Sequence, residues 1–255
     1  CSNLYDFAFC PEPCYDRLVD LADPEDWGLN NRILKNYLSF SFSRAVFLTE
    51  RDAEQEAPSN LPLVFDDGRC LFNTGLYTRR YENIYGLFEP NTKPDARQHW
   101  FLKGFFKESD PVLVAFEYLP CRVHFAEDPS ELVFDYRLPI RSNIDHTLGD
   151  EENLTRIPTS LMGEDNSLLL RRAFEGAVAE AARRAAANYT LAVPQFYGGR
   201  IQLLLPLCLT SDKPELALTI QREDGFYAAR TCLTIEMAYN NARLICRPET
   251  SWIKR

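Results

Sequence analysis

The sequence lacks the short motifs by which many enzyme classes are identified. It contains no GxGxxG, no GxxxxGK[ST], no HExxH, no GxSxG and no CxxC. A dinucleotide-dependent oxidoreductase, a P-loop NTPase, a zincin and a serine hydrolase are therefore disfavoured. The sequence also has no uninterrupted apolar run of about 18 residues, so it predicts no transmembrane helix.

Histidine is scarce, and the cysteine spacing does not favour a metal site. The gap between Cys10 and Cys14 resembles half of a zinc site, but no second pair follows and all three histidines lie far away in the sequence. Three other cysteines stand in apolar runs, which predicts buried, reduced thiols without metal in a cytoplasmic protein. These three are Cys208, Cys232 and Cys246.

Acidic residues outnumber basic ones, 37 to 28, which gives a net charge of −9. Such a chain does not coat nucleic acid over its whole surface. The segment 73–107 has the opposite balance, because it contains Arg79, Arg80, Lys93, Arg97, Lys103 and Lys107 against Glu82, Glu89 and Asp95. A basic patch on an acidic protein suits a phosphate-bearing ligand that is held at one place.

The length of 255 residues and 45% hydrophobic content predict one α+β domain spanning 1–255. Because the first residue is Cys1, we expect this domain to come from a longer, multi-module chain. The pattern predicts about nine strands, mostly antiparallel, flanked by about three helices. A helix or a helix pair is expected from Pro24 to Ala45. Further helices are expected over 168–188 and after a Thr234 cap.

Two Asp-Gly pairs, Asp67-Gly68 and Asp224-Gly225, predict the turns of two β-hairpins. Further strands are expected from apolar or alternating stretches. These stretches are 83–91, 99–109, 111–119, 130–140, 189–197 and 200–209.

The stretch 72–91 alternates rings, amides and arginines. If it begins with a strand, one face carries Asn73, Gly75, Tyr77 and Arg79, and the opposite face enters the core. A ring beside arginines could stack on a base while a phosphate is neutralised. The alternative is an exposed strand face with ordinary cross-strand Tyr–Arg pairs.

Three other stretches carry candidate residues. Arg200 and Gln202 follow a Gly-Gly turn and share a strand face, and we expect Gln202 to lie in or beside the same sheet as Asn73. In 234–244, helical spacing places Glu236, Asn240 and Arg243 on one side. Asp145 and His146 are adjacent, and a histidine with a neighbouring carboxylate can act as a general base. For each stretch, an ordinary turn, cap or surface loop is the alternative.

Several long words of the sequence resemble the bacterial domain-of-unknown-function family number 3825. They are "LYDFAF", "ILKNYLSFSFSR", "FNTGLYTRRYENIYGLFEPN", "AVPQFYGGRIQLLLPLCLT" and "TCLTIEMAYNNARLICRPETSWI". The resemblance covers nearly the whole chain and implies no activity. It implies a flanking RNA-binding module, such as a cold-shock-like domain, and so favours a nucleic-acid context.

The sequence therefore predicts a nucleotide- or RNA-linked protein. One hypothesis is a phosphoesterase assisted by Mg²⁺ or Mn²⁺, with catalytic residues drawn from Asp145, His146, Glu89 and Glu236. The alternatives are a non-catalytic RNA or nucleotide sensor and a protein-interaction scaffold. The expected ligand-binding residues are Asn73, Tyr77, Arg79, Arg80, Lys103, Tyr197, Arg200, Gln202, Asn240 and Arg243.

Overall fold

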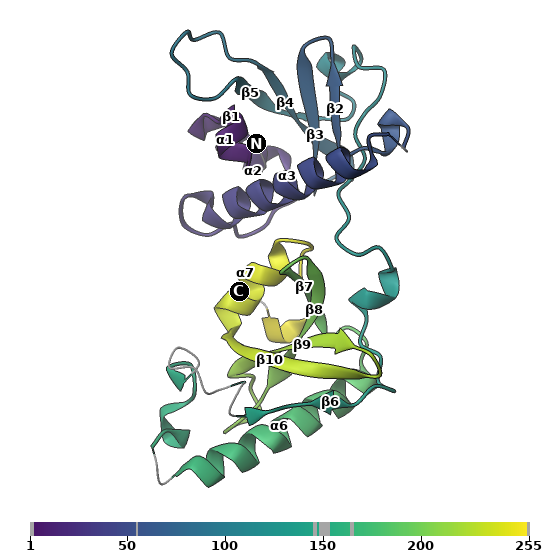
Figure 1. Ribbon diagram of the computed structural model, residues 1–255. Helices are drawn as coiled ribbons and strands as arrows, with labels where there is room; N and C mark the ends of the chain where they lie inside the picture. The colour runs from purple at the N-terminus through teal and green to yellow at the C-terminus, as the bar shows by residue number, and fades with distance from the viewer. Residues whose placement is uncertain (1–2, 55, 145–146, 148–153, 164–165, 254–255) are drawn as a thin grey trace. The chain divides into compact units, whose positions relative to one another are not determined.

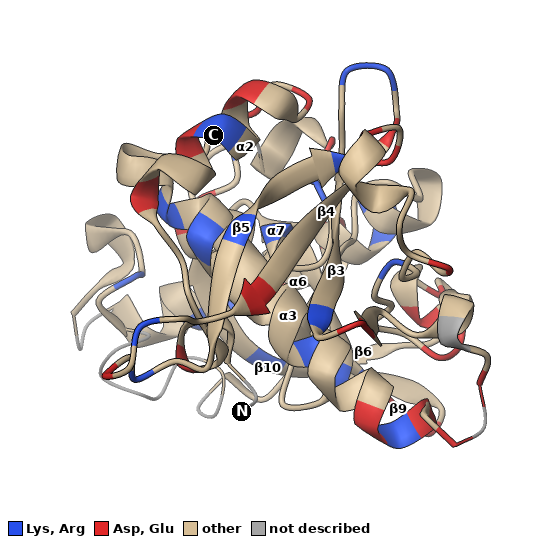
Figure 2. Cartoon of the chain, turned by 90° about the horizontal axis from the view of Figure 1, so that it is seen from above, with Lys and Arg blue, Asp and Glu red and all other residues tan. Residues whose placement is uncertain are grey.

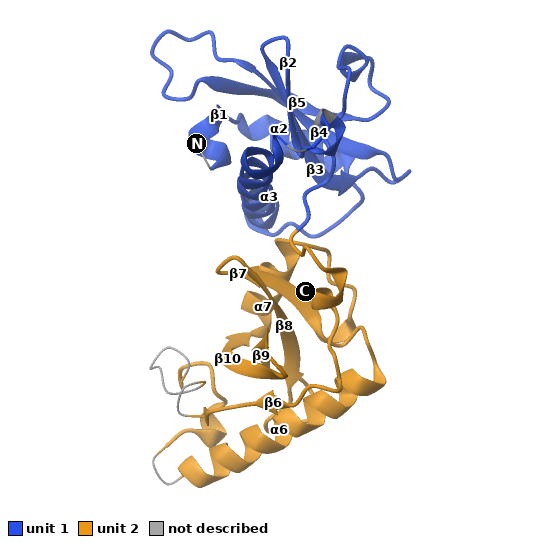
Figure 3. Ribbon diagram, turned by 45° about the vertical axis from the view of Figure 1, so that its right-hand side comes forward, with its two compact units in different colours: residues 1–124 blue, residues 125–255 orange. Residues whose placement is uncertain are grey.

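The computed structural model describes residues 3–54, 56–144, 147, 154–163 and 166–253. The chain divides into two compact units, unit 1 with residues 1–124 and unit 2 with residues 125–255 (Figure 3). Each unit contains one five-stranded sheet. That the whole chain acts as one domain stays a prediction.

The sheet of unit 1 has the strand order β1-β5-β4-β3-β2. All neighbours are antiparallel except β1 and β5, which are parallel. The expected turn between β2 and β3 is confirmed, because Asp67 and Gly68 have φ of 44° and 69°, as a tight hairpin requires. The strands are β1 (Ala8–Phe9), β2 (Leu63–Asp66), β3 (Arg69–Tyr77), β4 (Asn83–Pro90) and β5 (Trp100–Lys107).

The described residues of unit 1 form three α-helices: α1 (Leu4–Phe7), α2 (Glu12–Leu21) and α3 (Arg32–Asp52). The long helix α3 lies along the sheet (Figure 1), and the ring of Phe42 contacts those of Phe72 and Phe88 at centroid distances of 5.4 and 5.8 Å. The expected helix start at Pro24 is wrong. Gly28, at φ 71°, and the left-handed residues that follow it break the helix, which begins only at Arg32.

The opposite face of this sheet is covered by the segment 111–123. Leu113 and Phe116 are buried against Leu71, Tyr85 and Leu87. The strand expected over 111–119 is wrong, because this segment contains only a single 3-10 turn, Pro111–Leu113. Its apolar residues Leu113, Phe116 and Leu119 recur every third position, a spacing that a strand cannot direct to one face.

The sheet of unit 2 has the order β6-β10-β9-β8-β7, with all neighbours antiparallel except β6 and β10. The helix α6 (Ser167–Ala187) packs on one face and α7 (Ile235–Arg243) on the other (Figure 1). Thr234 caps α7 as expected, since its hydroxyl accepts from the Met237 backbone nitrogen at 3.2 Å. The strands are β6 (Ile140–Arg141), β7 (Val193–Tyr197), β8 (Arg200–Leu207), β9 (Leu216–Glu223) and β10 (Phe226–Thr234).

The strand expected over 130–140 is wrong, since only its last residue, Ile140, enters the two-residue strand β6. Pro129 opens a 3-10 turn instead, and Phe134 is buried in a stacked contact with Tyr227 at 5.1 Å. The α+β, mostly antiparallel character of the fold is confirmed, with ten strands and five helices among the described residues. Among them, no helix has both the length and the apolar character needed to cross a membrane.

The expected burial of three thiols is confirmed only in part. Cys232 is fully buried, whereas Cys208 and Cys246 are half-buried, because each follows the end of its strand or helix. All three are free thiols.

Candidate functional site

A row of side-chain amides crosses the sheet of unit 2 on the face that α7 covers. Gln195 and Gln202 are direct partners across β7 and β8, and Gln195 Nε2 donates to Gln202 Oε1 at 2.9 Å. Gln202 Nε2 donates in turn to Gln221 Oε1 on β9 at 3.2 Å. From α7, Asn241 Nδ2 donates to Gln195 Oε1 at 3.1 Å. We call these four residues the amide row.

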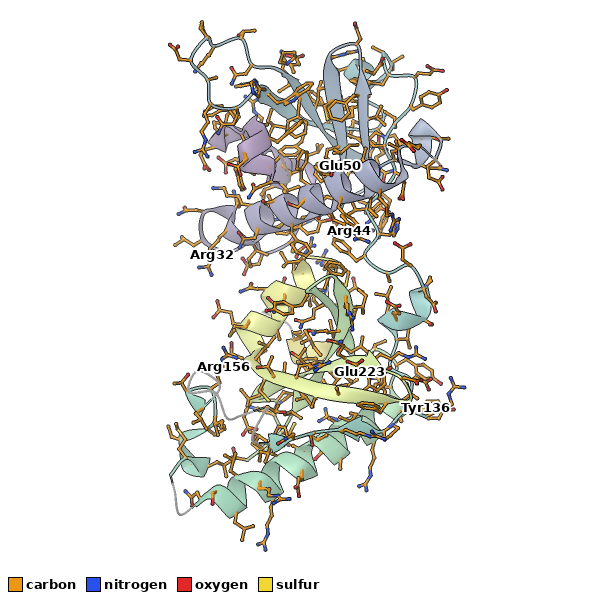
Figure 4. All side chains as sticks on the ribbon, viewed as in Figure 1. Arg32, Arg44, Glu50, Tyr136, Arg156 and Glu223 are labelled. Carbon is orange, nitrogen blue, oxygen red and sulfur yellow. The ribbon has the colours of Figure 1, made fainter. Side chains whose placement is uncertain are left out.

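The amide row has a direction and ends at a carboxylate. Every amide donates toward β9, and Gln221 Nε2 donates to Glu223 Oε1 at 3.0 Å. Arg230 on β10 donates to the same oxygen. Aligned hydrogen bonds polarise one another, so the row fixes the position of the Glu223 carboxylate. Figure 4 shows Glu223 on this sheet.

Strand alternation explains why these side chains meet. On β9 the even positions Leu216, Leu218 and Ile220 enter the core beneath α6, so Gln221 and Glu223 face the other way. A β-bulge between Ala229 and Thr231 inserts Arg230 into β10. The bulge re-aims the arginine, which therefore reaches Glu223.

Several polar atoms at this end of the row are unused. Thr219 Oγ1 and Arg230 Nε are buried and have no hydrogen-bond partner. Within the described part of the chain, the recorded bonds to Glu223 all reach Oε1 and none reaches Oε2. Buried polar atoms are nearly always paired, so two unpaired ones on neighbouring strands indicate a place where a water or ligand binds.

An aromatic ring and a guanidinium group lie beside Glu223. Phe226 is the cross-strand partner of Glu223, and the guanidinium of Arg141 on β6 lies 4.2 Å from its ring centroid. Thr219, Glu223, Phe226, Arg230 and Arg141 together are called the open end of the amide row.

Three residues expected from the sequence lie on this face. Gln202 belongs to the amide row, and Tyr197 and Arg200 are exposed partners beside it, joined by the turn of Gly198 and Gly199. Gln195, Gln221, Glu223 and Arg230 were missed. The period-two spacing of Gln221 and Glu223 on a strand was the signal that could have identified that pair.

The expectation for α7 needs a correction. The amide that reaches the sheet belongs to Asn241, three residues after the buried Ala238, whereas Asn240 is not part of the row. Glu236 is exposed and Arg243 is buried at 3% exposure, so these two do not present one polar face to a ligand. The face of α7 that packs on the sheet is the one that contains Ala238 and Asn241.

In unit 1, the side chain of Asn73 is buried and hydrogen-bonded to the backbone of the same unit. It is 3% exposed, its Nδ2 donates to the Pro120 carbonyl at 3.0 Å, and its Oδ1 accepts from the Gly75 nitrogen at 2.9 Å. The expected exposed face on this strand is wrong, because the segment 111–123 covers it. The expected common sheet is also wrong, since Asn73 lies in the sheet of unit 1 and Gln202 in that of unit 2.

The turn between β3 and β4 presents Arg79 and Arg80 to solvent, as expected. Neither guanidinium has a recorded partner among the described residues. Tyr81, between β3 and β4, is 84% exposed and has the left-handed φ of 62°. Beside the turn, the guanidinium of Arg122 lies 5.8 Å from the ring of half-buried Tyr77. These five residues are called the arginine turn.

Lys103 and Glu89 form an exposed ion pair at 3.2 Å. Glu89 is six residues beyond Asn83 along β4, and Asn83 adjoins the arginine turn, so the pair lies about 20 Å away at ~3.4 Å per residue. Lys103 therefore does not share a phosphate with Arg79. Figure 2 shows basic and acidic residues interspersed along the chain.

Asp145 and His146 lie outside the described residues. Within the residues that are described, no three His, Cys, Asp or Glu side chains are grouped as a metal site would require. Comparisons with curated proteins and with solved structures each gave no match. A family model for a domain of unknown function, DUF3825, matches residues 18–252, and the chain therefore belongs to that family.

Proposed function

We propose that the protein binds single-stranded RNA or a nucleotide, and that the arginine turn holds the phosphates. The observation that carries the proposal is the pair of exposed, adjacent arginines, Arg79 and Arg80, whose guanidinium groups have no recorded carboxylate partner among the described residues. The nearest acidic side chain in the turn, Glu82, is bound to Lys107 at 3.5 Å and to the Ser109 nitrogen at 3.2 Å.

Rings next to these arginines favour a nucleic-acid ligand over an acidic protein. Tyr81 is held outward at the tip of the turn, and Tyr77 is already stacked against a cation, Arg122. Bases stack on such rings while arginines bind the phosphates between them. An acidic protein could pair with the arginines without contacting the exposed rings. It is the alternative that the experiment must distinguish from RNA.

The overall charge of −9 repels polyanions at long range, so binding must come from these close contacts. Each arginine–phosphate hydrogen bond contributes about 1.5–3 kcal/mol. Loss of two therefore weakens binding about a hundredfold or more, at about 1.4 kcal/mol per tenfold. A reducing compartment such as the cytoplasm fits this proposal, because the described cysteines are free thiols.

The test compares two double variants that change charge equally. Arg79→Glu with Arg80→Glu reverses the two positive charges of the arginine turn. Arg171→Glu with Arg172→Glu reverses those of an exposed Arg-Arg pair on α6. We expect the first to abolish binding of short single-stranded RNA and to flatten its salt dependence, and the second to retain both, with melting temperatures unchanged. Equal affinity of wild type and the first variant would refute the proposal.

Incubation of the same RNA with Mg²⁺ or Mn²⁺ tests the hydrolase hypothesis, whose candidate catalytic residues are Asp145, His146, Glu89 and Glu236. Product formation would add an activity to the binding proposed here. RNA that is bound and recovered intact would leave a sensor module.

A further inference from the structure

We propose that the open end of the amide row is a subsite for a nucleobase, and that it prefers guanine. This inference rests on the proposed function, since it assigns a base-reading role to unit 2 while the arginine turn of unit 1 holds phosphates. It is carried by different residues, in a different unit, and by a different observation.

The observation is the set of unused polar atoms. Thr219 is 1% exposed and its hydroxyl has no partner, and Arg230 Nε is likewise buried and unpaired. The two residues are neighbours, because Thr219 is the cross-strand partner of Thr231, which follows Arg230 in the bulge. Thr219 lies on the face of Gln221 and Glu223, two and four residues along the same strand. The unpaired donors and Oε2 of Glu223 therefore lie on one face of the sheet.

The Glu223 carboxylate makes this region a poor site for a simple anion. Arg230 and Glu223 are bonded to each other, so the pair is neutral as a whole. Inorganic phosphate would meet the carboxylate as well as the guanidinium. A neutral, planar molecule with both donors and acceptors on one edge meets no such repulsion, and a nucleobase has this character.

Guanine matches the pattern better than the other bases. Its Watson–Crick edge presents two adjacent donors, N1–H and the N2 amine, next to the acceptor O6. The two lone pairs of Glu223 Oε2 can accept from both donors, since Oε1 already accepts from Gln221 and Arg230. The unpaired N–H of Arg230 and the hydroxyl of Thr219 can donate to that acceptor. Adenine presents one donor beside one acceptor, cytosine presents one donor beside two acceptors, and uracil presents one donor between two acceptors.

The neighbouring side chains add a stacking surface and rigidity. The guanidinium of Arg141, over the Phe226 ring at 4.2 Å, is exposed and offers its outer face to a base. The amide row holds Glu223 in place through Gln221, Gln202 and Gln195. A carboxylate fixed before binding loses little conformational freedom when the ligand arrives.

The test uses nucleosides with the full chain, because a nucleoside has no phosphate for the arginine turn to bind. Titration of guanosine, inosine, adenosine, cytidine and uridine is followed by NMR chemical shifts or calorimetry. We expect guanosine to bind about tenfold or more tightly than the others. Inosine, which lacks the N2 amine, should lose most of this advantage.

Three variants locate the site. Glu223→Gln and Arg141→Gln should each weaken guanosine binding, the first by about tenfold or more. Arg141 is exposed, so its variant tests the subsite even if Glu223→Gln disturbs the fold. The control is Arg222→Gln, because Arg222 is exposed on the opposite face of the same strand and should leave binding unchanged.

Nucleosides that bind equally, or that fail to bind, would overturn the subsite. Equal effects of Arg141→Gln and Arg222→Gln on guanosine binding would also overturn the subsite. If guanosine binds as described while the Arg79→Glu, Arg80→Glu variant keeps full RNA affinity, the arginine turn is eliminated and the subsite stands. If RNA binding depends on the turn but guanosine does not bind, the proposed function stands without the subsite.

Discussion

The side chains of Gln195 and Gln202 are both buried, at 3% and 6% exposure, and are joined by a single N–H···O bond of 2.9 Å across β7 and β8. A buried amide without a partner is costly, so each glutamine depends on the other. The amide row therefore links the stability of this sheet face to the placement of Glu223.

Replacement of Gln202 by leucine should reduce the free energy of unfolding by about 1–3 kcal/mol, because Gln195 Nε2 and Gln221 Oε1 lose their partners while volume is nearly kept. Urea denaturation measures the change. The double variant Gln195→Leu, Gln202→Leu should cost less than the sum of the two single variants, since no amide of that pair is left unpaired. A single variant as stable as wild type would contradict the dependence.

Alanine substitutions at two glycines of unit 1 should distinguish the cost of steric crowding from the cost of a strained backbone. Gly75 and Gly68 have almost equal φ, 71° and 69°, but a Cβ on Gly75 would lie 2.6 Å from Tyr37 Oη, whereas Gly68 has nothing within 4 Å. Gly68→Ala should cost about 1–2 kcal/mol from the left-handed backbone alone.

Gly75→Ala should cost more, because the Tyr37 hydroxyl must move and give up its hydrogen bond to the Thr74 carbonyl at 2.8 Å. Thermal and urea unfolding of the two variants provide the comparison. Equal destabilisation would show that the crowding relaxes without loss of the bond.

Thiol labelling of the native protein should distinguish the cysteines by burial. Burial raises the pKa of Cys232 to about 12, so at pH 8 its thiolate is scarce as well as inaccessible. Half-buried Cys208 and Cys246 should react first, and Cys232 only after unfolding. Mass spectrometry of peptides after timed labelling identifies each site. Labelling of Cys232 as fast as Cys208 would contradict the core position.

Acid titration should reveal the environment of Asp135. Two hydrogen bonds from Arg137, at 2.7 and 2.8 Å, lower the pKa of this carboxyl from its ordinary value of 3.8 to about 2. Because the folded-state pKa is lowered, the associated stability is fully present above 3.8 and is lost as the pH falls toward 2.

Arg137→Gln should return the pKa of Asp135 toward 3.8 and remove that part of the acid sensitivity. The control Arg222→Gln should shift it less, since Arg222 reaches Asp135 Oδ2 only at 3.8 Å. NMR titration of the side-chain carboxyl resonance measures both. Equal shifts in the two variants would contradict the dominance of Arg137.

Local signals in the sequence were sufficient wherever the physical cause is local. Asp67-Gly68 forms its turn because these residues tolerate positive φ. Thr234 caps α7 with a bond to a residue three positions away. Exposure of Arg79 and Arg80 follows from a turn that is too short and polar to be covered.

Only the tertiary structure decided features that depend on distant segments. Residues 111–119 do not form a strand, and Leu113 and Phe116 instead pack against Leu71, Tyr85 and Leu87 of the sheet. Asn73 is buried because Pro120, 47 positions later, supplies its acceptor. The site in unit 2 likewise depends on strand register, which joins Gln195 to Gln202 and places Glu223 opposite Phe226. Register arises from the packing of whole strands, so no short stretch of sequence contains it.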